Sequence, residues 1–575
     1  MYFTFTVPIP KDTKKISFNT IKGVRYVNYE YDRVYKPEKK YNVPKRTTIG
    51  RVSEDNPEEM YPNPNYLKYF PEAGIPEGLE RTGRSSCVKI GAYLVIDKII
   101  RDYHLDLMME QIYEGNRTGA GLFLDLAAYA LITENNAAQY YPDYAYNHAL
   151  FTPRHKIYSD ATVGKFINQI SIDDSIHFQN MWNSERDHRE KIYISYDSTN
   201  KHCQAGDIDI AEYGHSKDGC DDKAVFNYSV AYDRKNREPL FYEEYPGSIV
   251  DITQLQFMLN KAKAYGYKHA GFILDRGYFC KENLNFMDKC GYDFVIMVKG
   301  MRSLVSELIL DKQGSFEKKR SCYIHDYEVY GTTEKKLMFP GDEKERYFHL
   351  YYSASRCATE MNAVETKIDK MAKYLKSMEG QPVEIDRSFE KYFRIEYFHK
   401  GKKDQKFACA FERTDVVDRE LTLCGYFSII TSEKMTAEEA IDLYKSRDAS
   451  EKLFKSDKSF LGNKSLRVHS PESADAKIFI AFVALIIRNR IYTLLKDEGR
   501  RSGHDYNFMN VPAAIRELEK IEMIKQSREV YLIDHAITAN QKTILKAFGM
   551  DKNYVLQKAR MISEELNPNT LIVEA

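Results

Sequence analysis

The chain has 575 residues, 43% of them hydrophobic, and its 84 lysines and arginines balance 84 aspartates and glutamates. That length allows three or four domains with true cores, while a net charge of zero excludes a uniformly basic nucleic-acid-binding protein, so any such surface must arise from local segregation of charge. Nine scattered cysteines without a C-x2-C pair argue against a zinc ribbon and a disulfide scaffold, and favour a reducing cytosol.

Residues 1–85 are predicted to form a basic β-arm. The segment VRYVNYEYDRVY alternates like a strand, and KPEKKYNVPKRTTIGR follows it with closely spaced cations. The first residues, MYFTFTVPIPKD, lack the charged start and the long apolar run of a signal peptide. The arm is either a solvated β-structure or a surface for the DNA backbone. In the second case the candidate contacts are Lys39, Lys40, Lys45, Arg46 and Arg51.

Residues 86–183 are predicted to be helical, because VKIGAYLVIDKIIRDYHLDLMMEQIY and GAGLFLDLAAYALITEN carry apolar residues at helical spacing. The segment YSDATVGKFINQI begins with a helix-cap signal and places Thr162, Lys165 and Asn168 on one face. That face fits a DNA recognition helix, but any short capped helix has the same pattern. The single tryptophan, Trp182, is expected to pack rather than to stack on a base.

Residues 186–300 change character. REKIYISYDSTN, FNYSVAYD, PLFYEEYPG, AGFILDRGYF and DFVIMVKG are predicted strands, and DITQLQFMLNKAKAYGY and KENLNFMDKCGY are predicted helices. The order β-β-β-α-β-α-β is that of a ribonuclease-H-like α/β core with a mixed five-stranded sheet. In such a sheet the first and fourth strands are neighbours. Asp197 and Asp275, expected at the ends of these two strands, would therefore share one edge.

Residues 301–425 are predicted to be an insertion domain, rich in β-strands and with one helix, ATEMNAVETKIDKMAKYLKSM. GYFSIITSEK then returns to the core, so that residues 426–497 complete it. The apolar run IFIAFVALII is shorter than the ~20 residues that a membrane span needs, which favours a buried helix and no membrane partner. Residues 498–575 show no chemistry and serve either partner contacts or a structural cap. No G-x4-GK[ST] loop is present, so no nucleotide cofactor is expected.

The segment DLYKSRDASEKLFKSDK, residues 442–458, is predicted to be one helix that follows a T-x-x-E capping box. At ~100° per residue, one face carries a phenol, a carboxylate and three cations within an arc of ~80°. A carboxylate among fixed cations suits a site that holds a metal ion and a phosphodiester together. The alternative is an exposed helix with i,i+4 ion pairs. The residues of this face are Tyr444, Arg447, Glu451, Lys455 and Lys458.

The spacing Y-x2-R-x3-E-x6-K in this helix resembles the signature of bacterial insertion-sequence transposases of family four, which are DDE enzymes with a ribonuclease-H-like core. YDST and LDRG, which contain the two aspartates, resemble the first and second aspartate motifs of that family. GHSKDGCDDKAVFNYSVAYD and PGSIVD look like one of its branches. The resemblance covers residues 186–300 and 425–495 well and the rest loosely.

The resemblance implies a metal-dependent transposase. Asp197, Asp275 and Glu451 would hold two Mg²⁺ or Mn²⁺ ions about 3.5–4 Å apart, with Asp448 as the rival ligand on the same helix. Tyr444, Arg447, Lys455 and Lys458 would hold phosphates, and a basic loop would add Lys464, Arg467 and His469.

By the same resemblance, the enzyme cuts double-stranded DNA at the terminal inverted repeats of its own element and joins the freed 3′-hydroxyl to target DNA. The implied partners are these DNAs and a second protomer in a synaptic complex, in the bacterial cytoplasm at the nucleoid. Two other functions stay open. One is a ribonuclease-H-like nuclease or resolvase without strand transfer, and the other is a catalytically silent DNA-binding descendant. An intact acidic triad argues against the second.

Overall fold

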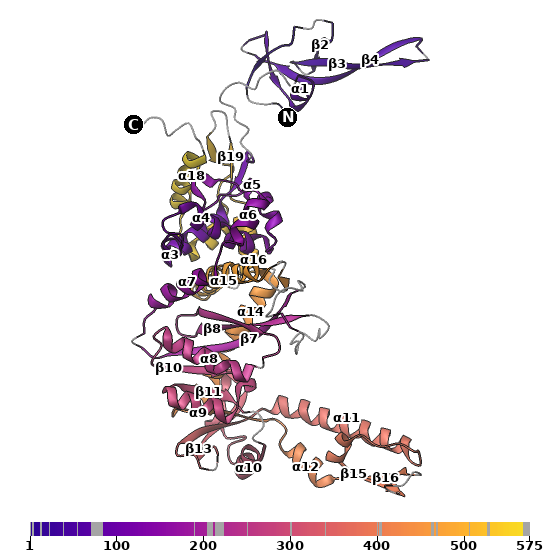
Figure 1. The fold of residues 1–575 in the computed structure, drawn as a ribbon, viewed down its shortest axis with the longest axis vertical. Helices are drawn as coiled ribbons and strands as arrows, with labels where there is room; N and C mark the ends of the chain where they lie inside the picture. Colours follow the sequence, from indigo (N-terminus) through magenta and orange to yellow (C-terminus); the bar gives the residue numbers. More distant parts are fainter. Residues whose placement is uncertain are drawn as a thin grey trace.

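The computed structural model is elongated, and its parts follow one another along the long axis (Figure 1). An N-terminal β-sheet lies at one end, a helical region and a large sheet occupy the middle, and a projection of helices and strands lies at the other end. The structure describes residues 2–566 except for 3–4, 12–13, 22, 38, 55, 71–83, 189, 204–210, 213–223, 250, 299–301, 340, 400, 402–404, 462–464, 467, 469, 505 and 526–529.

The N-terminal sheet has five antiparallel strands in the order β1-β5-β4-β3-β2. Val27, Ile49, Met60 and Tyr66 form its small core. Only the base of the long hairpin is buried, so its outer half is exposed to solvent on both faces. The elements are β1 (Val7–Pro8), β2 (Ile16–Ile21), β3 (Val24–Lys36), β4 (Tyr41–Val52), β5 (Glu59–Pro62) and helix α1 (Pro64–Tyr69).

The helical region is built around two helices that are apolar on nearly every side. α4 (Arg117–Thr133) and α15 (Pro471–Ser502) pack against each other at its centre. A helix that is apolar all round has no solvent face, so other helices must surround it. Those from the first half of the chain are α2 (Gly91–Asp102), α3 (Leu105–Ile112), α5 (Tyr141–Asn147), α6 (Asp160–Ile167) and α7 (Ile172–Ser184).

The C-terminal segment completes this same region. β19 (Glu522–Lys525) pairs with both β20 (Tyr531–Ile533) and β6 (Cys87–Lys89), so the C-terminal segment shares one small sheet with the strand that precedes α2. One core holds residues from both halves, from Val88 to Ile562. The C-terminal segment therefore packs into the helical region. Its helices are α16 (Val511–Leu518), α17 (Ala539–Ala547) and α18 (Lys552–Leu566).

The helix α15 contains the longest apolar run of the sequence. Within the described chain it is the one helix long and apolar enough to cross a membrane, yet 78% of its most apolar window is buried inside the protein. The expectation of a buried core helix is confirmed.

The large sheet is mixed, as the sequence predicts, and its first seven elements follow the predicted order. β7 and β10 are parallel, β10 and β11 are parallel, and β8 and β9 continue antiparallel from β7. The elements are β7 (Ile192–Cys203), β8 (Val225–Asp233), β9 (Glu238–Pro246), α8 (Asp251–Ala264), β10 (Ala270–Leu274), α9 (Lys281–Cys290) and β11 (Asp293–Met297).

The sheet is larger than the five strands predicted, because ten strands pair in it. β17 (Tyr426–Thr431) adds to β11, and β14 (Glu345–Tyr352), β13 (Val329–Leu337) and β12 (Tyr323–Ile324) follow, while the short β18 (Ser465–Leu466) pairs with β7. Three strands of the predicted insertion thus extend the core sheet instead of forming a separate body. Helix α10 (Arg302–Lys312) precedes them.

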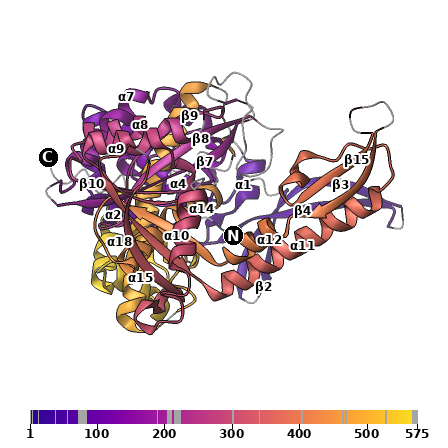
Figure 2. The same ribbon diagram turned by 90° about the horizontal axis from the view of Figure 1, so that it is seen from below.

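The projection consists of α11 (Ala354–Met378), β15 (Phe393–Phe398), β16 (Lys406–Glu412) and α12 (Thr414–Thr422), and it lies to one side of the sheet (Figure 2). It has its own small core, which includes Ile368 and Phe407. Its two ends meet, since the Ser353 N–H donates to the Gly425 carbonyl at 3.0 Å. Gly425 has φ +85°, and a Cβ there would lie 2.6 Å from Cβ of Cys357, so this return into β17 requires glycine.

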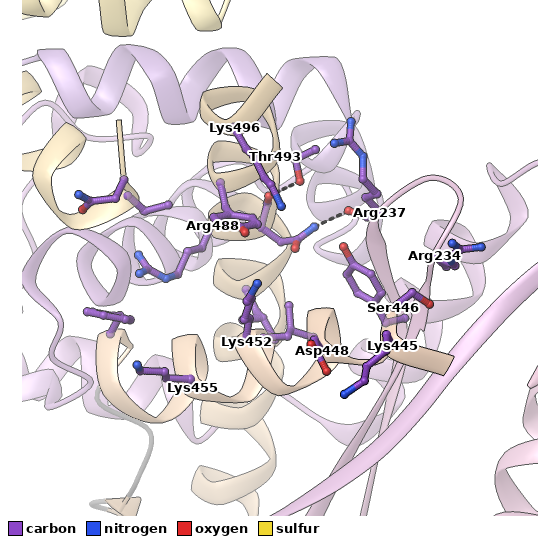
Figure 3. Close-up of a pocket in the computed structure, with 18 of the residues that line it drawn as sticks. Arg234, Arg237, Lys445, Ser446, Asp448, Lys452, Lys455, Arg488, Thr493 and Lys496 are labelled. Carbon is purple, nitrogen blue, oxygen red and sulfur yellow. Dashed lines mark hydrogen bonds between the residues drawn. The ribbon is translucent and has the colours of Figure 1, made fainter. Parts of the chain in front are cut away.

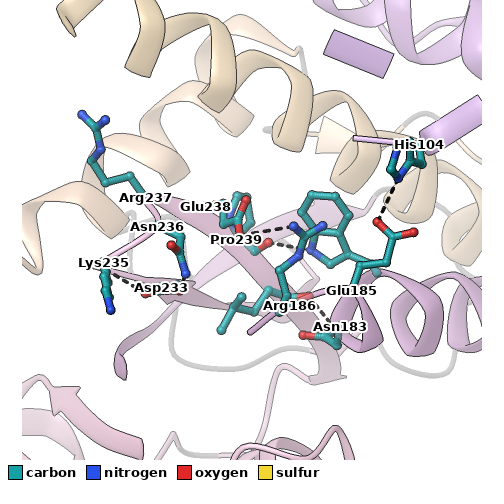
Figure 4. A network of polar contacts seen from close by, with 12 residues as sticks. His104, Asn183, Glu185, Arg186, Asp233, Lys235, Asn236, Arg237, Glu238 and Pro239 are labelled. Carbon is teal, nitrogen blue, oxygen red and sulfur yellow. Dashed lines mark hydrogen bonds and ion pairs between the residues drawn. The ribbon is translucent and has the colours of Figure 1, made fainter. Parts of the chain in front are cut away.

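A polar network joins the helical region to the turn between β8 and β9 (Figure 4). The Arg186 guanidinium lies 3.6 Å from the centre of the Trp182 ring and 3.5 Å from a carboxylate oxygen of Glu238. The Trp182 indole N–H donates to the Pro239 carbonyl at 2.9 Å, and the ring is fully buried. The expectation that Trp182 packs is confirmed.

Candidate active site

The register of two parallel strands brings Asp197 and Asp275 together. Tyr196 of β7 is the partner of Leu274 of β10, so the two aspartates that follow are neighbours across the strands. β10 ends there, and the Asp275 carboxylate accepts the Arg276 N–H at 2.8 Å in a short helical turn. The sequence therefore predicted the right pair of strands for the two acids.

The expected position of Asp197 needs one correction. β7 does not end at Asp197 but continues to Cys203, because β8 pairs with it as far as His202 and β18 pairs with its last residues. The sheet edge is thus a step: β10 stops, β7 continues, and the two carboxylates lie at the corner between them.

The predicted helix over residues 442–458 is two helices. The capping box is present, with Thr436 and Glu439 bonded reciprocally, and α13 (Ala437–Lys445) follows it. The chain then turns at Ser446 and Arg447 before α14 (Asp448–Phe460). No glycine or proline marks the break, and both turn residues keep near-helical dihedral angles, so the hydrophobic pattern runs through it.

The break places Arg447 over the two aspartates. Its Nη1 lies 3.5 Å from Oδ2 of Asp197 and 3.9 Å from Oδ1 of Asp275. The Arg447 side chain is only 16% exposed, so a largely buried guanidinium faces two carboxylates. This positive charge offsets the repulsion between the two acids.

Tyr444 belongs to the same group, but not as part of a solvent-facing surface. The predicted shared face is wrong for this residue, whose ring is buried in a core cluster between α13 and the sheet. Its hydroxyl donates to Oδ1 of Asp275 at 3.5 Å. Burial raises the pKa of Tyr444 to about 12, so the phenol remains a donor at neutral pH.

The third predicted acid, Glu451, belongs to α14, one turn after Arg447, and its side chain lies outside the described residues. Among described residues no group of three metal-ligating side chains is present. The rival ligand Asp448 is exposed and lines a pocket on the other side of the junction. Carboxylate oxygens are the donors that Mg²⁺ and Mn²⁺ prefer, and a cation already faces both aspartates, so the residues present fit such an ion.

The predicted lysines are divided between two places. Lys455 is exposed and lines the same pocket as Asp448, while Lys458 is half-buried in the last turn of α14. Lys464, Arg467 and His469 lie outside the described residues.

A buried ion pair that sequence reasoning missed lies beyond the aspartates. Lys201 of β7 and Asp457 of α14 are both fully buried, with Nζ 2.5 Å from Oδ2, and the Lys201 ammonium lies 4.5 Å from the centre of the Tyr228 ring. Lys201 shares the face of β7 that carries Asp197, about 13 Å farther along the strand. Asp457 lies about 9 Å along the helix from Glu451. The pair therefore fixes how α14 lies along β7. The one available signal was a lysine four residues after Asp197 inside a strand.

The basic residues of the N-terminal arm lie on its hairpin. Lys39 and Lys40 are exposed in the turn between β3 and β4, whereas Lys45 lies 3.5 Å from Asp32 and Arg46 lies 3.7 Å from Glu30. The Arg51 guanidinium lies over the Tyr61 ring at 5.3 Å.

The possible recognition helix is present as α6, with Ser159 as its N-cap and with Thr162 and Lys165 exposed. Asn168 follows it and accepts a hydrogen bond from Ser473 at the start of α15. This residue therefore takes part in packing between helices.

The model of one protein family, described as Transposase DDE domain, matches residues 191–487, which is more than half of the chain. The chain belongs to this family. The two adjacent aspartates at the step of the sheet and the helix pair over them both lie inside the matched range of this DDE transposase.

A search of solved structures finds a cryo-EM structure of the piggyBac transposase synaptic complex with hairpin DNA. The identity is 7% and the TM-score 0.29, over 69% of this chain and 62% of that one. The DDE transposase therefore spans less than two thirds of the length of that protein. A comparison with curated proteins finds no match.

Proposed function

We propose that this DDE transposase is of the insertion-sequence family-four type, cuts DNA at the terminal inverted repeats of its element, and transfers the 3′-hydroxyl strands into target DNA. The observation that carries the proposal is the pairing of Asp197 with Asp275 in register, beneath Arg447 and Tyr444. The Y-x2-R-x3-E-x6-K spacing, which supplies Glu451 and Lys458, supports the assignment to this type.

In this proposal Asp197, Asp275 and Glu451 hold two divalent metal ions, which supply an activated oxygen nucleophile and stabilise the leaving oxygen. With such ions bound, Arg447 would contact a phosphate oxygen instead of the carboxylates, since one guanidinium position cannot serve both. Tyr444 orients the Asp275 carboxylate through its hydroxyl. Lys458 is a further phosphate contact. Its ammonium is a point charge on a flexible side chain, so it can approach a phosphate from many directions.

The proposal also assigns tasks to the other regions. The hairpin of residues 1–85 contacts the DNA backbone, residues 86–183 with α6 bind the element ends, and residues 301–425 with the projection form the insertion within the ribonuclease-H-like core. The segment 498–575 is a structural cap. The functional form is a homodimer that synapses two ends in the bacterial cytoplasm, at the nucleoid.

The test is a cleavage and joining assay with oligonucleotides taken from the DNA that flanks the gene, in the presence of Mg²⁺. Asp197→Asn and Asp275→Asn should abolish cleavage and keep end binding, whereas Asp418→Asn on the surface of α12 is the matched control and should behave as wild type. Cleavage without any joined product would support the nuclease alternative instead. Unchanged cleavage in both active-site variants would contradict the proposal.

A further inference from the structure

A basic pocket lies on the other side of the α13–α14 junction from the two aspartates. It has a volume of about 960 Å³, and its walls come from α13, α14, the turn between β8 and β9, and α15 (Figure 3). Ser446 and Asp448, which line it, flank Arg447 in the sequence. A chain of phosphates could therefore pass from the aspartates to the pocket over a single turn of backbone.

The charges in this pocket are not balanced. Two of its arginines are already engaged: Arg237 makes a bidentate pair with Asp497 at 2.6 and 2.8 Å, and Arg234 pairs with Asp442. The other basic side chains have no carboxylate partner within ion-pairing distance in the part of the chain that the structure describes. They are Lys445, Lys452, Lys455, Arg488, Lys496 and Arg500.

Arg488 is the observation that points to a ligand. It is only 4% exposed, lines the pocket from α15, and packs its guanidinium 4.5 Å from the centre of the Phe460 ring. Its Nε is buried and has no hydrogen-bond partner among the described residues. A buried guanidinium that lacks an ion-pair partner among the described residues is costly even with the longer-range attraction of Glu134, and its unmet Nε–H donor is suited to an anion. Burial also lowers the pKa of Arg488 to about 10, which still leaves it charged at neutral pH.

The shape of the pocket selects among anions. Ligand pockets of roughly 300–1,000 Å³ take small molecules or short segments, so this pocket is large enough for a few nucleotides of one strand. The lining also includes Tyr327 and Tyr492, whose rings are at least partly exposed and can stack on unpaired bases. Cations together with aromatic rings along a half-open pocket are typical of single-strand binding.

We propose that this pocket binds the phosphates of a single nucleic-acid strand that runs over the α13–α14 junction from the site of cleavage. The inference rests on the proposed function, because the strand is assumed to enter the pocket from the cleavage site at Asp197 and Asp275. Lys452 and Lys496 neutralise successive phosphates, and Arg488 makes the innermost contact. A duplex is held elsewhere, on wider surfaces.

The test measures binding by fluorescence anisotropy without divalent metal, so that it does not depend on cleavage. The probes are a labelled single-stranded oligothymidylate and a blunt duplex of the same length. The pocket variant is the double substitution Lys452→Gln/Lys496→Gln. Its control is Lys373→Gln/Lys376→Gln on exposed α11, which removes the same charge. The pocket variant should weaken single-strand binding by about tenfold, and it should flatten the log–log salt dependence by about 1.4, since each phosphate contact on a single strand contributes about 0.7. Duplex affinity and the control variant should stay at wild-type values.

Arg488→Lys keeps the charge and Arg488→Gln removes it, so a larger loss of single-strand binding in the second, at equal melting temperature, would support the inner contact. If Arg488→Gln does not fold, the binding of the Lys452→Gln/Lys496→Gln variant still tests the proposal. Equal losses on duplex and single strand, or none on either, would overturn the proposal. So would competition by inorganic tripolyphosphate as effective as that by the oligonucleotide at equal phosphate concentration. All of these outcomes are separate from the cleavage defect of Asp197→Asn.

Discussion

The two sides of the α13–α14 junction carry charge in opposite ways. On one side, one arginine is shared by two aspartates, so the charges are matched within a few ångströms. On the other side, a group of lysines and arginines surrounds a pocket with few acids, and one of its arginines is buried. A chain of zero net charge thus contains a matched group of charges on one side of a turn and an excess of positive charge on the other. The comparison teaches that overall charge says little about such a surface.

The largest effect is expected from removing one of the two aspartates that Arg447 faces. Asp275→Asn removes one of two adjacent carboxylates and should slow cleavage at least about a thousandfold, which corresponds to about 4 kcal/mol of transition-state stabilisation. Single-turnover cleavage of end DNA measures it. Binding of the same DNA should change by less than about threefold, because phosphate contacts and not metal ligands provide affinity. A parallel loss of binding in folded protein would contradict this division.

The next effect concerns the ion pair that holds α14 on β7. Asp457→Asn removes the ion-pair partner of the fully buried Lys201, which then keeps only the more distant attraction of Glu244, and should lower the free energy of unfolding by about 3–5 kcal/mol. Urea denaturation measures the loss. The double variant Lys201→Met/Asp457→Leu should recover most of it, because both charges of the buried pair are then removed together.

The matched control for that pair is Glu345→Gln, which breaks a half-exposed pair with Lys335 and should cost no more than about 1 kcal/mol. If Asp457→Asn is as mild as this control, α14 is not held by the pair. If the double variant is stable but cleaves slowly, the pair positions Glu451 as well as stabilising the fold.

Arg447 sharpens the comparison because its guanidinium can contact either the two carboxylates or a phosphate. Arg447→Gln should keep metal binding and weaken end binding by about tenfold, with a salt dependence flatter by about 0.9 for duplex DNA. Arg447→Lys should recover only part of the affinity, because an ammonium cannot make a bidentate phosphate contact. Binding isotherms at several salt concentrations measure both. An unchanged slope in Arg447→Gln would confine this side chain to its contacts with the two aspartates.

The smallest effect is expected for Tyr444→Phe. The hydroxyl makes one long hydrogen bond to Asp275, so its loss should slow cleavage by about fivefold, or about 1 kcal/mol. Since burial raises the pKa of Tyr444 to about 12, the phenol keeps its proton well above neutral pH and loses it only as pH approaches that value. The rate profiles of the wild type and the variant between about pH 7 and pH 9 should therefore run parallel. A wild-type profile that falls in this range while the variant stays flat would contradict the raised pKa.

The sequence predicted those features that depend on local pattern. Alternation and length were enough for the order of strands and helices from β7 to β11, and parallel pairing of the first and fourth strands then brought Asp197 to Asp275. The continuation of β7 was missed because it depends on the pairing of β8 and β18 with β7, and no local sequence pattern predicts that pairing. The break at Ser446 was missed because neither turn residue disfavours a helix.

The buried charges were missed for a related reason. Arg488 closes an apolar run and Lys201 lies within a strand, and either position would suit a side chain that reaches solvent. Only the packing of α14 and α15 against the sheet shows that both are enclosed. The third acid and the basic loop after it remain predictions, because their side chains lie outside the described residues.

The meeting of Ser353 and Gly425 has a consequence for the history of the gene and for its engineering. Everything between them leaves the sheet and comes back to the same point, and Tyr352 is already paired with Tyr426 across the gap. A short turn could join β14 to β17 directly. The coding segment for the projection could therefore be removed, exchanged or acquired in one event, and the pairing register of the core strands would stay the same. The projection is thus a separable insertion between two adjacent strands, and a variant that lacks it would be a shorter protein with its sheet intact.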